Sequence, residues 1–279
     1  MSKLIFSRKQ FSSFIFQCFC MLTAILILLP VLYALSISFM ESHEILHRDL
    51  RLLPGGLYTG NYVKAFTQTT LLRFMWNSLV VATVVSVVRI FAGSLAAFSF
   101  AFFQFPGKRL IFYLYLCSLM IPIDILLLPN YLTVSRLGLI NTYLGMMIVF
   151  FTSALFIFMM RQAFLSYSKS LKEAAHIDGC SNFKFYWNIL LPSSVPIGIT
   201  IFISSFVSIW NTYIWPMLVT TRNEMRTIQV AITMLNFPDE SPHGSVMAAA
   251  VLILLPSIFI FMVGQRWIKA GMSAGAIKG

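Results

Sequence analysis

Six long apolar runs limit what this chain can fold into more than any other feature of its sequence. The first run, residues 14–39, has 26 residues without a single charge. As a helix at ~1.5 Å per residue it would be about 39 Å long, enough to cross the ~30 Å hydrocarbon core of a membrane. Five further runs follow at 74–103, 110–130, 142–165, 193–219 and 244–265. The sequence therefore predicts an all-α, polytopic membrane protein whose six transmembrane helices form one domain over residues 1–279.

The composition supports this class and weakens another. Only 10% of the residues are charged, whereas a soluble domain carries about 25%. In a soluble chain the formal net charge of +11 would suggest nucleic-acid binding. Here the basic residues flank apolar runs, where they commonly anchor the cytoplasmic ends of membrane helices. We therefore expect membrane lipid, and no nucleic acid, as a partner.

The distribution of basic residues predicts the orientation. With six spans both termini lie on one side, and that side carries twelve Lys and Arg residues against seven on the other. Basic residues are enriched in the cytoplasmic loops of membrane proteins. Both termini and the long polar segment at residues 166–192 are therefore predicted to be cytoplasmic.

Proline residues fall in or beside the predicted spans. A proline removes a backbone donor and bends a helix, and the freed carbonyls are tolerated where helices line a cavity. We prefer this interpretation, although prolines are also simply common in membrane helices. The residues concerned are Pro30, Pro122, Pro129, Pro196, Pro216 and Pro256.

The segment 166–192 is the most structured polar part of the sequence. Residues 169–177 favour a helix, Asp178-Gly179 predicts a break, and Ser181 can cap a second helix. The second helix is unusually aromatic, with Phe183, Phe185, Tyr186 and Trp187. Two short helices with a turn between them can fit a groove in a partner protein. The alternative is an ordinary loop between spans.

The same segment carries a motif of fixed spacing. Glu173-Ala174-Ala175 is followed after three intervening residues by Gly179, and after nine further intervening residues by Ile189, Leu191 and Pro192. This pattern resembles the EAA motif of bacterial ABC importer permeases. The sequence LLPSSVPIGITIFISSF after the motif, the pairs Trp210-Asn211 and Trp215-Pro216, and the closing SAGAIKG resemble the maltose-type, carbohydrate-importing subfamily.

The resemblance implies a transport subunit, not an enzyme, in the bacterial inner membrane. It implies a second homologous permease, two ATPase subunits and an extracytoplasmic solute-binding protein as partners. ATP and Mg²⁺ would be bound by the ATPases, because this chain has no Walker A motif and no GxGxxG motif and is expected to bind no cofactor and no metal. The residues that would couple the chain to an ATPase are Glu173, Ala174, Ala175, Asp178, Gly179 and Pro192.

Two charges lie well inside predicted spans, Arg89 and Asp124. A charge inside a membrane is costly and points to a function or to a charged partner. Three interpretations stay open: an ion pair between the two residues, contact of one of them with the transported solute, or exposure to lipid headgroups and water. Asp124 is therefore a candidate for the substrate pathway.

Aromatic and amide side chains gather in the fifth predicted span, at Trp210, Asn211, Tyr213 and Trp215. Such side chains suit the faces and hydroxyls of a sugar, so we predict that they line the substrate pathway. They would equally suit an interfacial aromatic belt. The sequence does not identify the solute, and import of glycerol-3-phosphate or another polyol derivative is the alternative to a sugar or oligosaccharide.

One motif points to a different class of protein. His43-Glu44-Ile45-Leu46-His47 matches the HExxH pattern of zinc proteases. That chemistry needs both His residues on one face of a helix, a third ligand and a cleft, and a short loop before Pro54 is a poor place for it. A membrane protease is therefore a distant alternative, as is a transporter that works without ATP.

Overall fold

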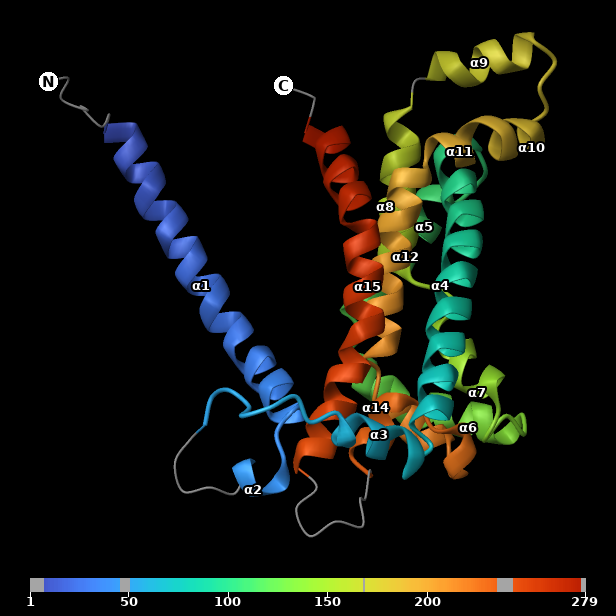
Figure 1. The fold of residues 1–279 in the computed structure, drawn as a ribbon. Helices are drawn as coiled ribbons and strands as arrows, with labels where there is room; N and C mark the ends of the chain where they lie inside the picture. The colour runs from blue at the N-terminus through green and yellow to red at the C-terminus, as the bar shows by residue number, and fades with distance from the viewer. Residues whose placement is uncertain (1–7, 46–50, 168, 235–242, 277–279) are drawn as a thin grey trace, which may run out of the picture. The chain divides into compact units, whose positions relative to one another are not determined.

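The computed structural model describes residues 8–45, 51–167, 169–234 and 243–276. Within these ranges the chain is mostly helical and forms no β-strand (Figure 1). Three helices are long and apolar enough to cross a membrane by themselves. They belong to α1 (Arg8–Ser38), α4 (Leu71–Phe102) and α15 (His243–Ala276). The all-α, polytopic fold predicted from the sequence is confirmed.

Three further candidate spans are bent pairs of shorter helices, which bring the number of spans to as many as six. The bend is 96° between Lys108–Met120 and Ile123–Arg136, 53° between Tyr143–Phe150 and Ala154–Ser166, and 72° between Asn182–Ser193 and Val195–Trp210. The predicted runs 110–130, 142–165 and 193–219 are therefore interrupted helices. The elements are α5 (Lys108–Cys117), η1 (Ser118–Met120), η2 (Ile123–Leu126), α6 (Leu127–Arg136), α7 (Tyr143–Met147), η3 (Ile148–Phe150), α8 (Ala154–Ser166), α9 (Lys169–Ile177), α10 (Asn182–Phe185), η4 (Tyr186–Leu190), α11 (Leu191–Ser193), α12 (Val195–Trp210), α13 (Ile214–Val219), η5 (Asn223–Met225) and α14 (Ile228–Ile232).

The prolines act differently from one helix to another. Helices α1 and α15 continue through Pro30 and Pro256. Pro122 lies in the break between η1 and η2, and Pro196 follows the break before α12. Because proline cannot donate a backbone hydrogen bond, the two breaks at Pro122 and Pro196 follow from the sequence, whereas the break before α8 has no proline.

The chain divides into two compact units. Unit 1 comprises residues 1–71 and 235–254, and unit 2 comprises residues 72–234 and 255–279. Unit 1 contains α1, α2 (Ser42–Ile45), α3 (Gly60–Thr67) and the start of α15. The remaining elements and the rest of α15 belong to unit 2, apart from the first residue of α4.

In unit 1 the buried side chain of Asn61 ties α3 to the end of α1. Its amide nitrogen donates to the carbonyl oxygens of Ser38 at 3.0 Å and Met40 at 2.8 Å. The Tyr62 hydroxyl lies 2.7 Å from the hydroxyl of Ser38. Carbonyls at the C-terminus of a helix have no partner within the helix, so Asn61 supplies donors that α1 lacks. The close fit of Asn61 against Gly244, where an added Cβ would lie 2.5 Å from the amide nitrogen, requires a glycine there.

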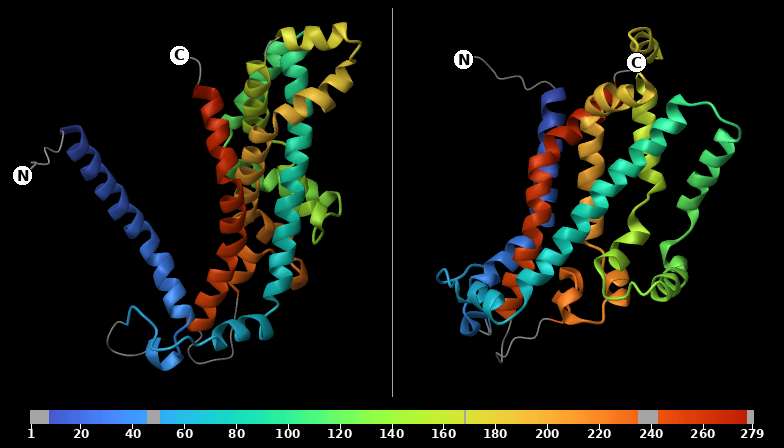
Figure 2. Two further views of the ribbon diagram at one scale, coloured as in Figure 1. Left: turned by 45° about the horizontal axis from the view of Figure 1, so that its top comes forward. Right: turned by 90° about the vertical axis from the view of Figure 1, so that its right-hand side faces the viewer.

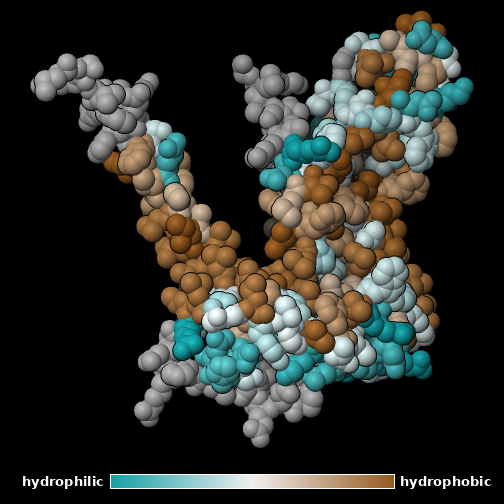
Figure 3. Space-filling view, in the orientation of Figure 1, coloured by the Kyte–Doolittle hydropathy of each residue, from teal (hydrophilic) through white to brown (hydrophobic). Residues whose placement is uncertain are grey.

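In unit 2, α8 and α12 run side by side and α4 crosses them obliquely (Figures 1 and 2). Their buried residues form one hydrophobic cluster that also includes residues of the 166–192 segment. Within unit 2 the surface is apolar along the middle of the helices and more polar at their two ends (Figure 3). This banding is expected of helices that cross a bilayer.

We predict that Asn61→Ala destabilises unit 1. The substitution leaves two carbonyls at the end of α1 without a donor, which costs about 1–3 kcal/mol. Thermal unfolding of the purified protein in detergent, followed by circular dichroism, should show a lower midpoint. Gln68→Ala, which removes an exposed amide just after α3, is the matched control, and equal midpoints for the two variants would contradict the assignment.

Candidate functional site

The EAA motif lies on α9 and on the turn that ends it. Gly179 has φ +76°, the left-handed conformation that glycine adopts most readily. The amide of Cys180 donates to the carbonyl of Ala175 at 2.8 Å, and the amide of Gly179 donates to that of His176 at 3.0 Å. This pair of bonds is a Schellman motif, which satisfies the last carbonyls of a helix. The predicted helix 169–177 and the break at Asp178-Gly179 are confirmed.

The second helix of the segment also begins where the sequence predicts. The Ser181 hydroxyl accepts a hydrogen bond from the amide of Lys184 at 3.3 Å, which is an N-cap. Helices α10, η4 and α11 then follow without a gap, and η4 is a turn of π-helix. The two short helices lie at one end of unit 2, with α9 outermost (Figure 1).

The aromatic residues of the second helix divide into two pairs. Phe185 and Tyr186 are each 1% exposed, whereas Phe183 is 69% and Trp187 38% exposed. The ring of Phe98 on α4 lies 5.2 Å from that of Tyr186, between centroids. The buried pair therefore fixes the segment to the core of unit 2, and the exposed pair forms an apolar surface.

Tyr186 also makes a buried polar contact. Its hydroxyl lies 2.7 Å from the hydroxyl of Ser94 on α4. Elsewhere in the segment, Lys172 on α9 donates to the carbonyl of Phe102 at 3.4 Å and lies over the ring of Phe103. These contacts attach both halves of the segment to the end of α4.

The two alanines of the motif have different roles. Ala175 is buried in the hydrophobic cluster, whereas Ala174 is exposed. Both were predicted to couple the chain to an ATPase, but the small side chain of Ala175 is packed in the core of its own chain. Glu173, Ala174, Ile177, Asp178 and Gly179 form the exposed surface of α9 and its turn, and Pro192 is exposed further along the segment, in α11.

The carboxylates of Glu173 and Asp178 on this surface have no ion-pair partner among the described residues. Within the described ranges, the ion pairs that form lie in unit 1, and neither Glu173 nor Asp178 takes part in one. Ile177 beside them is 86% exposed. An apolar side chain flanked by free carboxylates suits a protein partner with an apolar groove and basic residues.

Tyr167 is a contributor that sequence reasoning missed. Its hydroxyl donates to the carbonyl of Ser193 at 2.6 Å. Because Tyr167 precedes α9 and Ser193 ends α11, this bond joins the two ends of the segment. A contact across 26 residues leaves no local pattern in the sequence that could have predicted it.

Arg89 does not pair with Asp124. Its guanidinium donates to the carbonyl of Phe150 and, at 3.1 Å, to the hydroxyl of Ser205. It also lies over the ring of Phe156, 5.5 Å from the centroid. Arg89 thus joins α4 to the break between η3 and α8 and to α12, and the ion-pair interpretation is wrong for this structure.

Asp124 is exposed on η2, directly after the bend at Pro122. Within the described ranges it forms no ion pair. Contact with the solute, or with water and headgroups, stays a prediction for this residue.

The predicted pathway residues of the fifth span fall into two groups. Trp210 and Trp215 are 2% and 3% exposed, and the indole nitrogen of Trp215 donates to the carbonyl of Gly145 at 3.2 Å. Asn211 is exposed and Tyr213 half-buried in the break between α12 and α13. In this conformation only the second group can meet a solute, and the pathway role of all four stays a prediction.

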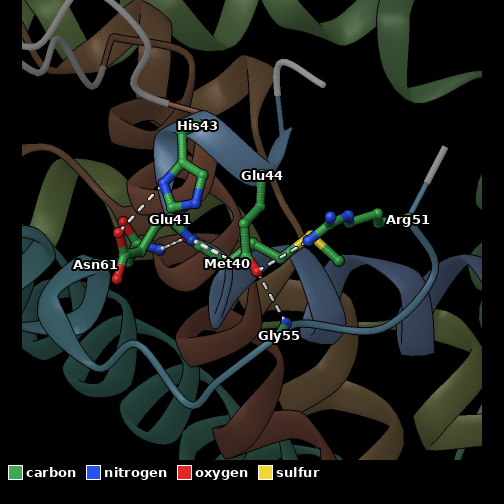
Figure 4. Close-up of polar contacts among 7 residues, drawn as sticks. All are labelled: Met40, Glu41, His43, Glu44, Arg51, Gly55 and Asn61. Atoms are coloured by element: carbon green, nitrogen blue, oxygen red, sulfur yellow. Dashed lines mark hydrogen bonds and ion pairs between the residues drawn. The ribbon is translucent and has the colours of Figure 1, made fainter. Parts of the chain in front are cut away.

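The glutamate of the HExxH pattern, Glu44, binds neighbouring loop residues. The backbone amides of Glu41 and Gly55 donate to the Glu44 carboxylate at 3.2 and 2.9 Å, and Arg51 lies 3.6 Å away (Figure 4). His43 pairs with Glu41 at 3.3 Å, and His47 lies outside the described residues. Glu44 thus holds a loop together, and within the described ranges no cluster of metal-ligating side chains forms.

Comparison with known proteins identifies the family. Residues 53–274 match the family described as "Binding-protein-dependent transport system inner membrane component". The chain is 34% identical over 274 residues to the "sn-glycerol-3-phosphate transport system permease protein UgpE" of Brucella melitensis, covering 95% of this chain and 97% of the relative. It is 30% identical to the "Arabinooligosaccharides transport system permease protein AraQ" of Halalkalibacterium halodurans, over 92% and 93% of the two chains.

A solved structure has the same fold. It is described as the "Crystal structure of a bacterial ABC transporter involved in the import of the acidic polysaccharide alginate". The TM-score is 0.82 at 23% identity, over 95% of this chain and 99% of that chain.

The chain is thus a polytopic inner membrane protein of the permease class. It belongs to the family of inner membrane components of binding-protein-dependent transport systems, the ABC importer permeases that the EAA motif indicated. That resemblance is confirmed. The chain is the non-enzymatic membrane component of its transport system.

We predict that Gly179→Ala weakens the turn after α9. An added Cβ would meet nothing within 4 Å, so the penalty is conformational, about 1–2 kcal/mol for a left-handed residue with a side chain. Hydrogen exchange at the α9 amides should become faster. Gly179→Asn, which tolerates this conformation better, is the matched control, and equal exchange rates for wild type and Gly179→Ala would contradict the prediction.

We predict that the Glu44 loop loosens at acid pH. The Glu44 pKa lies below its ordinary value of 4.5, chiefly because the Glu41 amide donates to the carboxylate, against an opposing effect of burial. A lowered folded pKa means that ionised Glu44 stabilises the loop above 4.5 and that this stabilisation is lost as the pH falls through the lower folded value. Exchange of the Gly55 amide, corrected for the intrinsic pH dependence, should rise over that interval.

Two substitutions make this test specific. Glu44→Gln should remove the pH dependence, because the amide side chain does not titrate. Glu41→Gln, in the same turn, should retain it. A Gly55 amide whose corrected exchange is independent of pH in the wild type would refute the role of Glu44.

Proposed function

We propose that this chain is one of two permease subunits of an ATP-driven importer of carbohydrate, with both termini and the 166–192 segment in the cytoplasm. Two ATPase subunits would dock, one on the exposed surface of α9 and its turn in each permease, and an extracytoplasmic binding protein would deliver the solute to the opposite face. The observation that carries the proposal is the exposed α9, held by the Gly179 turn and presenting Ile177 between free carboxylates.

The attachments of α9 support a mechanical role. Lys172 links it to α4, Tyr167 links its N-terminal end to the end of α11, directly before α12, and the buried Phe185 fixes the helix after it. A displacement applied to α9 would therefore move the ends of α4 and α12 as well. Such rigid contacts allow closure of an ATPase pair to switch a bistable transmembrane core.

The proposed solute is a sugar or oligosaccharide. Asn211 and Asp124 are exposed and Tyr213 is half-buried, and their polar groups can bind hydroxyls; the relative from Halalkalibacterium halodurans is named for arabinooligosaccharides. The second candidate is a polyol phosphate, since the relative from Brucella melitensis is named for sn-glycerol-3-phosphate.

The proposed docking surface on α9 can be tested by introducing a bulky side chain into it. Ala174→Trp should leave the chain folded, because Ala174 is exposed, and should abolish co-purification of the ATPase and ATP-driven uptake. Gln68→Trp, an exposed position in unit 1, is the control and should retain both. If Ala174→Trp still binds the ATPase, α9 is not the docking helix.

Uptake by the reconstituted wild-type complex distinguishes the two candidate solutes from each other, and ATP-driven import from transport without ATP. Labelled arabinooligosaccharides and sn-glycerol-3-phosphate would be compared with and without ATP, in the presence of the binding protein. ATP-dependent uptake of an oligosaccharide supports the proposal, and uptake of sn-glycerol-3-phosphate alone would favour the second candidate. Transport without ATP would overturn both.

A further inference from the structure

A basic cavity lies where α4 turns into α5, outside the surface assigned to the ATPase. Its volume is about 760 Å³, and its walls come from the end of α4, the start of α5 and the end of α8. Three of the residues that line it are cationic, Lys108, Arg109 and Arg161, and none is acidic. All of these elements belong to unit 2.

Two of the cations are held in place by contacts that do not neutralise them. Arg161 donates to the carbonyl of Phe100 at 3.3 Å, and its guanidinium carbon lies 4.2 Å from the centroid of the Phe112 ring. Lys108 donates to the carbonyl of Phe103 at 2.7 Å. Within the described ranges none of the three cations forms an ion pair. Like charges gathered without a carboxylate favour an anion from outside the chain.

The rim of the same cavity is apolar. Leu110 is 63%, Tyr113 62% and Leu165 45% exposed, and all three line the cavity. Leu110 and Tyr113 are on α5, whose further residues Ile111 and Leu114 are also exposed. A ligand that fits must therefore place an anionic group among the cations and an apolar part along α5.

The position of the cavity matches the surface of a membrane. The turn between α4 and α5 lies at the same end of unit 2 as α9 (Figure 2), where apolar helices end. Basic pockets between transmembrane helices on the cytoplasmic side bind the headgroups of anionic lipids. We propose that this cavity binds the phosphate headgroup of an anionic phospholipid, with an acyl chain along α5. The assignment to the cytoplasmic leaflet rests on the orientation given under the proposed function.

The observations favour a lipid over a free anion. Inorganic phosphate would be satisfied by the cations and would gain nothing from Leu110, Tyr113 and Leu165. A phospholipid uses both parts of the cavity, because its phosphate meets the basic wall while its acyl chain covers side chains that would otherwise be exposed.

The test measures lipid binding to the purified wild-type complex directly. After removal of lipid by detergent exchange, phosphatidylglycerol, phosphatidylcholine or inorganic phosphate would be titrated and bound molecules counted by native mass spectrometry. We expect phosphatidylglycerol to bind in preference to phosphatidylcholine. Lys108→Gln with Arg109→Gln should weaken phosphatidylglycerol binding about tenfold or more, since each basic residue near the surface contributes measurably to lipid affinity.

The variants are chosen to keep the fold intact. Arg161 is left unchanged because it contacts Phe100 and Phe112. Lys184→Gln with Arg266→Gln removes the same charge from exposed positions outside the cavity and should leave binding of phosphatidylglycerol unchanged. Thermal unfolding of both variants checks that each complex remains folded.

Three outcomes would overturn the proposal: equal binding of phosphatidylcholine, an unchanged affinity in the Lys108→Gln, Arg109→Gln variant, or displacement of the lipid by inorganic phosphate at the same concentration. The last would identify a site for free anions. The measurement needs neither transport nor ATP, so its failure is separate from failure of the proposed function. If the chain were inserted with the opposite orientation, lipid binding in detergent would persist while the assigned leaflet would be wrong.

Discussion

The structure of unit 2 depends on finding donors for backbone carbonyls where its helices break. Hydrocarbon supplies no hydrogen bonds, so each carbonyl freed at a break must be satisfied from within the protein. Arg89 donates a hydrogen bond to the carbonyl of Phe150 at the break before α8, and Trp215 donates one to the carbonyl of Gly145 on α7. The intramembrane arginine and the buried tryptophan thus have related structural roles in this conformation.

The 166–192 segment packs into the core of the same unit. Phe185 and Tyr186 enter the cluster formed by α4, α8 and α12, so α9 stands on a base that continues into the spans. The segment has two surfaces that differ in burial and in polarity. One is buried and apolar, and the other has free carboxylates beside an exposed isoleucine.

Local chemistry was readable from the sequence, and contacts between distant residues were not. The helix at 169–177, its glycine stop and the Ser181 cap follow from neighbouring residues, as does the class of membrane protein. The interpretation of Arg89 and Asp124 as an ion pair was wrong, because the positions of two residues within their spans do not determine whether their side chains face each other. The exposure of Ala174, the burial of its neighbour Ala175 and the burial of Trp210 also depend on tertiary packing. Periodicity alone does not determine that packing. The basic cavity needs three elements that only folding brings together.

The uninterrupted helical path through Tyr186–Leu190 makes the segment intolerant of changes in length. From Ser181 to Ser193 the chain is one continuous helical path, and each residue added to or removed from a helix rotates the remainder of that helix by about 100°. A single insertion before Phe185 would turn its ring away from α4 and carry Tyr186 with it. The nine residues between Gly179 and Ile189 thus set the rotation of the aromatic face that is buried against α4 relative to the turn that ends α9.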